Sequence, residues 1–101
     1  MQIARVVGTV VSTEKEPALK GLRLYLLDPL GVDGAPTGEH LVAVDAVGAG
    51  AGEVVLFATG SSARQTPLTD RKPVDAVVMA IVDAWEVEGE VRYRKSEDEA
   101  A

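Results

Sequence analysis

The chain contains no cysteine and few aromatic residues: one Phe, one Trp and two Tyr among 101 residues. The lack of cysteine excludes disulfides and thiolate metal sites. Positive charge is also scarce, because 10 Lys and Arg face 16 Asp and Glu, which gives a formal net charge of −6. This balance argues against nucleic acid as a partner, since nucleic-acid binding depends on Lys and Arg that neutralise the backbone phosphates of the nucleic acid.

Long hydrophobic runs are missing as well. No apolar run approaches the ~20 residues that a membrane-spanning helix needs, so we expect no membrane partner. The N-terminal segment MQIARVVGTVV has neither a basic region before a long apolar stretch nor a small-residue cleavage site, and these mark a signal peptide. We therefore expect a soluble cytoplasmic protein, and the length predicts one domain.

What the chain does contain is mostly Val, Ala and Leu, a composition that favours strands. Segments rich in Gly and Pro separate five strand-like runs. The last run is nearly continuous in apolar residues, so a helix is the alternative there, but its Val and Ile content and the preceding Pro73 favour a strand. The five predicted strands are residues 3–13, 22–27, 40–47, 53–59 and 74–87.

The connections complete an all-β prediction. Gly8 indicates a bulge or a close backbone approach, and the glycine-rich residues 48–52 predict a hairpin turn between the third and fourth strands. Residues 61–65 predict one short helix with Ser61 as its N-cap. Five such strands predict a small OB-like β-barrel, with residues 1–89 as the barrel domain and residues 90–101 as a charged, frayed C-terminal tail.

Two glycine-containing segments are candidate sites. GAGAG, residues 48–52, is similar to phosphate-binding loops, but it leads into a strand and precedes Glu53, so a plain turn is favoured over an anion site. GSSAR, residues 60–64, offers two hydroxyls, a helix start and Arg64. In a monomer, a capped helix with a surface Arg is favoured over an anion site. A ring would place one copy of this segment per subunit around an axis.

Catalysis and metal binding have little support. A nucleophilic Ser61 or Ser62 needs a base, and His40 is the only histidine. The nucleophile elbow of serine hydrolases also requires a Gly two residues after the Ser, where this chain has Ala63 or Arg64. The carboxylates of the strands are spread singly, with no His or Cys cluster beside them. We expect no catalytic residue, no metal and no cofactor.

Three segments in order carry a resemblance to a known family: IARVVGTVVSTEKEPALKGLRLYLL (3–27), LVAVDAVGAGAGEVVL (41–56) and GSSAR (60–64). They resemble the pentameric vertex proteins of bacterial microcompartment shells, the ethanolamine-utilisation and carboxysome vertex protein family. The likeness extends from residue 1 to about residue 83. The segment from residue 86 onward matches no pattern of the family.

The resemblance implies a structural shell protein without enzymatic activity. It implies an OB-like barrel that assembles as a homopentamer and caps the five-fold vertices of a shell in the bacterial cytoplasm, next to hexameric or pseudohexameric facet proteins. It also implies that one of the two glycine segments lines the central opening. The axis candidates are Gly60, Ser61 and Ser62, and the subunit-contact candidates are Asp45, Gly48, Gly50, Gly52, Glu53 and Arg64.

Two other functions remain open at this stage. The first is a monomeric or dimeric OB-type module that binds a small ligand or nucleic acid. The second is a small hydrolase that uses Ser61 or Ser62.

Overall fold

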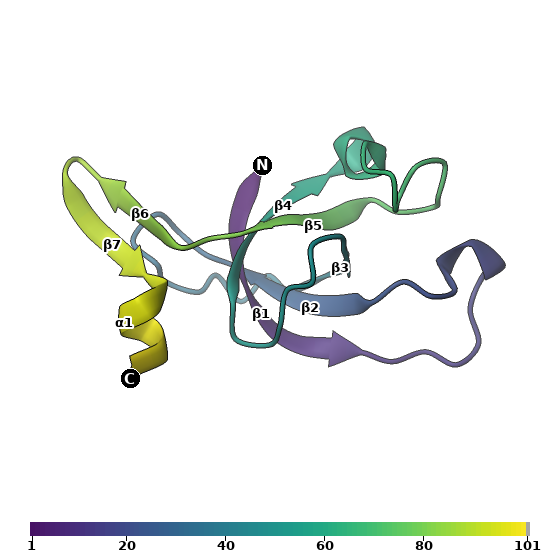
Figure 1. Ribbon diagram of the computed structural model, residues 1–101, viewed down its shortest axis with the longest axis horizontal. Coiled ribbons are helices and arrows are strands. Elements are labelled where there is room, and N and C mark those ends of the chain that lie inside the picture. The colour runs from purple at the N-terminus through teal and green to yellow at the C-terminus, as the bar shows by residue number, and fades with distance from the viewer. Residues whose placement is uncertain (101) are drawn as a thin grey trace.

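Five strands close into a barrel with the neighbour order β1-β2-β3-β5-β4. The computed structural model describes residues 1–100, with side chains through residue 98. The order is that of an OB-like barrel, so the predicted all-β fold is confirmed. The barrel strands are β1 (Gln2–Val10), β2 (Leu24–Pro29), β3 (Leu41–Asp45), β4 (Val54–Thr59) and β5 (Ala76–Ile81) (Figure 1).

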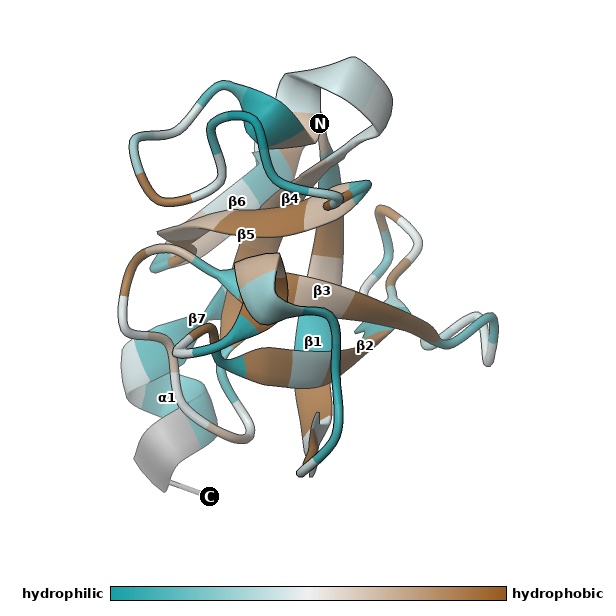
Figure 2. Ribbon diagram, turned by 90° about the vertical axis from the view of Figure 1, so that its right-hand side faces the viewer, coloured by the Kyte–Doolittle hydropathy of each residue, from teal (hydrophilic) through white to brown (hydrophobic). Residues whose placement is uncertain are grey.

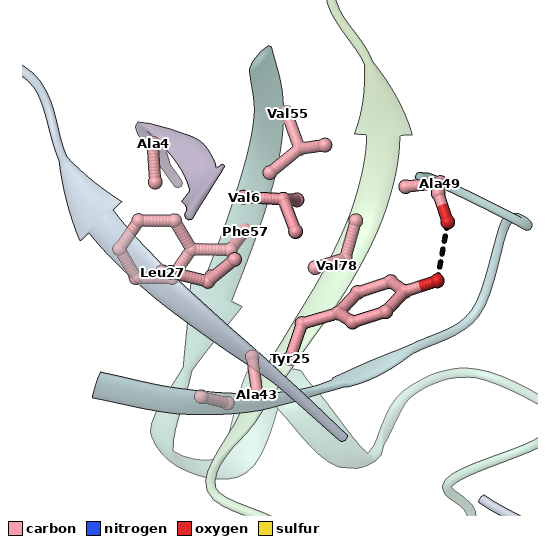
Figure 3. Packing of buried hydrophobic residues seen from close by; sticks show 10 residues of the cluster. Ala4, Val6, Tyr25, Leu27, Ala43, Ala49, Val55, Phe57 and Val78 are labelled. Carbon is pink, nitrogen blue, oxygen red and sulfur yellow. Dashed lines mark hydrogen bonds between the residues drawn. The ribbon is translucent and has the colours of Figure 1, made fainter. Parts of the chain in front are cut away.

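The barrel interior is filled by alternate residues of its strands, because successive side chains of a strand point to opposite faces. Figure 2 shows the hydrophobic colour concentrated along these strands, with hydrophilic loops outside. Phe57 and Leu27 are the largest fully buried side chains of the core. Small and β-branched residues surround them (Figure 3), namely Ala4, Val6, Ala43, Ala49, Val55, Ala76 and Val78, together with Tyr25.

The predicted hairpin of the third and fourth strands is wrong. β3 pairs with β2 and, in parallel, with β5 through Val44↔Val77, whereas β4 pairs with β1 and β5. β5 therefore lies between β3 and β4. The loop that joins β3 to β4 crosses an end of the barrel. The Tyr25 hydroxyl, which donates a hydrogen bond to the buried Ala49 carbonyl, holds the loop there (Figure 3).

Two local predictions are refined by the structure. A register shift between Val6 and Gly8 confirms the bulge in β1. A Cβ on Gly8 would meet its nearest neighbour at an ordinary 3.8 Å, so no close backbone approach requires glycine there. The short helix is a 3-10 helix, η2 (Gly60–Arg64), and its N-cap is Thr59 rather than Ser61. A second 3-10 helix, η1 (Pro17–Leu19), lies in the loop before β2.

The C-terminal region departs most from the prediction. The single strand expected over residues 74–87 is two strands, because β5 ends at Ile81 and β6 (Ala84–Val87) pairs with β7 (Glu90–Arg94) outside the barrel. The helix α1 (Lys95–Ala100) follows. The expectation of a frayed tail is therefore wrong for the described residues, and residue 101 lies outside them. The division at residues 89 and 90 falls in the turn of this hairpin and stays a prediction.

The hairpin and α1, residues 84–100, form an element that we call the C-terminal arm, on the side of the barrel away from η1 (Figure 1). The Trp85 ring stacks on Tyr93 with a centroid separation of 5.1 Å. The Trp85 indole N–H donates to the Val32 carbonyl at 2.8 Å. These aromatic contacts explain why a charged segment is ordered against the loop that follows β2.

The turn of the arm gives a first prediction, because Glu88 adopts a positive φ of 51° before Gly89 at 83°. Two-residue hairpin turns of this type favour Asn-Gly, since Asn tolerates the left-handed region better than Glu does. We expect Glu88→Asn to stabilise the protein by about 0.5 kcal/mol. Thermal unfolding of both proteins measures this, and an unchanged or lower melting temperature would contradict it.

Candidate functional site

The two candidate segments lie at opposite ends of β4. Residues 46–53, which we call the glycine loop, precede Val54, and η2 follows Thr59. A six-residue strand spans roughly 17–20 Å. The structure therefore separates the predicted site residues into two groups, one at each end of β4.

Asp45 organises the first half of the glycine loop. Its carboxylate is nearly buried, with 6% of the residue exposed. It accepts hydrogen bonds from the backbone N–H groups of Val47 (3.2 Å), Gly48 (3.0 Å) and Ala49 (3.3 Å). An ionised carboxylate satisfies several backbone donors at once. Within its own subunit, Asp45 thus shapes the loop that was predicted to make subunit contacts.

Glu53 organises the second half of the loop. One carboxylate oxygen accepts from the Gly50 N–H at 2.6 Å, and the other lies 2.6 Å from the Lys95 ammonium. The hydrogen bond from Lys95, followed by that from Gly50, lowers the pKa of the Glu53 carboxyl. Glu53 therefore links the glycine loop to the first residue of α1.

Backbone conformation explains two of the glycines. Gly48 and Gly52 have φ values of 78° and 86°, in the left-handed region that side chains disfavour. Gly50 differs, because a Cβ there would lie 3.4 Å from the Glu53 carboxylate oxygen. Two of the three glycines thus serve turns, whereas Gly50 has no positive φ and lies beside the Glu53 carboxylate.

At the other end of β4, η2 presents small polar side chains to solvent. Gly60 has a φ of 65°, and its N–H donates to the Asp75 carbonyl at 2.8 Å. Ser61 and Ser62 are exposed. Arg64 donates to the Val74 carbonyl at 3.3 Å, so its guanidinium is held back toward its own subunit. Gly60, Ser61, Ser62 and Arg64 are all exposed, so the exposed part of η2 carries a glycine, two serines and the tethered arginine.

A groove lies beside η2, between the starts of β3 and β5. Its volume is about 440 Å³, and Val42, Gly60 and Ala76 are among its lining residues. Val42 is 45% exposed, and the β3–β5 ladder pairs only two residues, both beyond this point. The pairing of β3 with β5 is therefore short here, and the groove exposes the apolar side chain of Val42.

The catalytic alternative gains no geometric support. The His40 imidazole lies 3.5 Å from the Asp28 carboxylate, and within residues 1–98 neither Ser61 nor Ser62 has a hydrogen bond to it. Among the described residues, no three His, Asp or Glu side chains gather as a metal site would require. None of the described helices has the length and apolar character to cross a membrane.

Sequence reasoning missed two residues from outside the glycine loop that contact it, Arg5 and Lys95. The Arg5 guanidinium donates to the Gly52 carbonyl at 2.7 Å and pairs with Asp98 of α1 at 3.2 Å. Arg5 lies 47 residues before Gly52, and Lys95 lies 42 residues after Glu53. No local sequence pattern predicts contacts between residues this far apart in the sequence.

The lowered pKa of Glu53 gives a second prediction, tested with Glu53→Gln. A group with a depressed pKa contributes stability above its usual value, here 4.5, and this contribution is lost as the pH falls through the pKa of the folded state. We expect Glu53→Gln to cost about 1 kcal/mol at pH 7 and less at pH 3, because the carboxylate loses its charge as the pH falls through its lowered pKa. Denaturant unfolding at both pH values tests this, and an equal cost at both would contradict it.

The sequence and the fold are both similar to those of known proteins. The family described as ethanolamine utilisation protein EutN/carboxysome matches residues 1–83. The carboxysome shell vertex protein CcmL of Gloeobacter violaceus is 46% identical over 97 residues, which cover 96% of this chain and 97% of that protein. Its solved structure superposes with a TM-score of 0.91 and 47% identity, covering 95% of this chain and 99% of that one.

Shorter relatives match as well. The microcompartment shell vertex protein PduN of Salmonella typhimurium is 47% identical over 82% of this chain and 96% of its own length. The structure of GrpN, a pentameric microcompartment shell protein from Rhodospirillum rubrum, superposes with a TM-score of 0.80 and 44% identity. It covers 86% of this chain and 99% of that one.

Proposed function

The chain belongs to the ethanolamine utilisation protein EutN/carboxysome family, and we propose that it forms homopentamers that close the five-fold vertices of a bacterial microcompartment shell. The observation that carries this proposal is the match of 96% of the chain to a carboxysome shell vertex protein. The pentameric GrpN, which aligns over almost its whole length, supports the subunit number.

The proposed function depends on the five-fold shape of the assembly rather than on chemistry. Hexameric tiles cover a plane, and a closed polyhedron requires five-fold corners. A ring of five identical subunits uses a different surface patch on each side of every subunit. Half-exposed valines of the barrel strands and of the glycine loop supply apolar area for such patches, namely Val7, Val42 and Val47. No catalytic step is needed for this role, and we propose that the protein is not an enzyme.

Electrostatics opposes the ring at long range. Five subunits at −6 each give −30 (5 × −6). Screening acts over roughly 10 Å at 0.1 M salt, so cohesion must come from apolar and hydrogen-bonded contacts at short range. We therefore assign the ring contacts to strand faces and loops rather than to ion pairs between subunits.

Because η2 and the glycine loop lie at opposite ends of β4, we assign a different role in the ring to each of them. Gly60, Ser61 and Ser62 converge on the five-fold axis, because small exposed side chains let five backbones approach one another. Asp45, Gly48, Gly50, Gly52 and Glu53 shape the loop that makes the lateral subunit contact. Arg64, bonded to its own Val74 carbonyl, supports η2 from behind.

The partners follow from the vertex role. The pentamer contacts hexameric or pseudohexameric facet proteins along its edges, inside the bacterial cytoplasm where the shell assembles. It has no nucleic-acid partner, membrane partner or cofactor.

Co-expression with the facet proteins of the same organism tests the vertex role. With the chain present, electron microscopy should show closed polyhedra that contain it at sub-stoichiometric amounts. Without it, the same facet proteins should give open sheets, tubes or shells with missing corners. Closed shells that form equally well without the chain and exclude it when present would overturn the proposal.

A further inference from the structure

The C-terminal arm touches the barrel at the glycine loop. Lys95 pairs with Glu53 at 2.6 Å, and Asp98 pairs with Arg5, which itself donates to the Gly52 carbonyl at 2.7 Å. Two contacts from α1 thus reach the end of the glycine loop, one directly at Glu53 and one at Gly52 through Arg5. The Lys95–Glu53 pair is partly shielded from water, with side-chain exposures of 26% and 22%, whereas the Arg5–Asp98 pair is more exposed, at 32% and 42%.

The arm is also fixed at its base and along its hairpin. The Lys95 backbone N–H donates to the Asp83 carbonyl at 2.7 Å, which closes the arm where it leaves β5. Trp85 ties the hairpin to the loop after β2 through the Val32 carbonyl. The arm therefore meets the glycine loop as a braced element rather than as a free chain end.

The relatives differ in how much of this chain they match. The family pattern ends at residue 83, before the arm begins. The pentameric GrpN aligns over 99% of its length with only 86% of this chain. A pentamer thus forms in a relative that leaves about one seventh of this chain unmatched, whereas the G. violaceus protein matches 95% of it in structure.

We propose that the C-terminal arm is a strut that holds the glycine loop in the shape that the lateral subunit contact requires, and so strengthens the ring. The proposal rests on the proposed function, because it assigns a purpose to the loop at the ring contact. When a loop becomes ordered only upon binding, the entropy cost of ordering it weakens the affinity. Holding the loop in its bound conformation beforehand reduces this cost. Glu53 is the residue at which strut and loop meet, and it acts as a positioning residue.

Glu53→Gln tests the strut, since glutamine keeps an acceptor for the Gly50 N–H and loses the charge that pairs with Lys95. Glu90→Gln is the matched control: it makes the same chemical change at an ion pair with Arg92 on the exposed hairpin. Hydrogen exchange of the glycine loop and the concentration at which the ring half-dissociates are measured for both variants and for the unaltered chain.

We expect Glu53→Gln to speed exchange in the glycine loop at least 3-fold and to raise the half-dissociation concentration about 5-fold. Glu90→Gln should change neither by more than 2-fold. Equal behaviour of the two variants would overturn the strut. Faster exchange with an unchanged ring would also overturn it, because the loop would then be no part of the contact.

A double-variant cycle separates the contact from general damage. The Glu53→Gln variant, the Lys95→Met variant and the double variant all lose the same ion pair. We therefore expect the Lys95→Met variant and the double variant each to weaken the ring by no more than about 2-fold beyond the effect of Glu53→Gln. Fully additive losses would contradict a shared contact. If the unaltered chain stays monomeric at every concentration, the vertex function fails, and the exchange comparison still decides whether the arm orders the loop.

Discussion

Replacing Asp45 with alanine should lower the free energy of unfolding by about 3 kcal/mol. The Asp45 carboxylate accepts three backbone N–H groups of the glycine loop. The N–H of Ala49 belongs to a fully packed residue, with 2% exposure, and has no route to water in the folded chain. For a domain of about 100 residues, this loss corresponds to a drop in melting temperature of roughly 15 °C.

Asp33→Ala is the matched control for this measurement. Asp33 accepts one backbone hydrogen bond, from Ala35 at 3.0 Å, in an exposed loop. Its removal should cost about 0.5 kcal/mol or less. Melting curves that show equal losses for the two substitutions would mean that the carboxylate of Asp45 does not hold the loop.

Placing an acidic group on η2 should disrupt the ring without unfolding the barrel. If Ser61 lies at the five-fold axis, Ser61→Asp brings five carboxylates together. Two unit charges ~8 Å apart repel by about 0.5 kcal/mol in water and about 2 kcal/mol at an effective dielectric constant of 20. Summed over the pairs of a ring, this repulsion amounts to several kcal/mol, and we expect the pentamer population at micromolar concentration to fall at least 10-fold.

Ser96→Asp provides the comparison, because Ser96 is an exposed serine of α1 and adds the same charge. Size-exclusion chromatography with light scattering should show an intact ring for Ser96→Asp and dissociated subunits for Ser61→Asp. Circular dichroism should show that both variants stay folded. A ring that tolerates Ser61→Asp as well as Ser96→Asp would place η2 on the outer rim.

The sequence predicts the barrel well because its signals are local. Val-rich runs mark each barrel strand within one to three residues at most ends, and glycine and proline mark the breaks. Pairing is not local, and the hairpin predicted across residues 48–52 was therefore wrong. Nothing near Gly50 indicates that β5, more than 20 residues later, separates β3 from β4.

The C-terminal arm was missed for a similar reason. Its residues are charged, and local composition predicted fraying. Its order comes from Trp85 on Tyr93 and from Lys95 on Glu53, contacts that join residues 8 and 42 positions apart. The sequence singled out two candidate segments, and their role in a ring stays a prediction. Their contacts within the subunit, such as the three hydrogen bonds to Asp45, could be seen only in the structure.

Native mass spectrometry of the purified chain tests the central claim most directly. At micromolar concentration and physiological ionic strength, a homopentamer should appear at about 53 kDa (5 × 10.6 kDa). A species at 10.6 kDa, or at about 21 kDa (2 × 10.6 kDa) for a dimer, would contradict the vertex function. It would favour a monomeric or dimeric OB-type module instead.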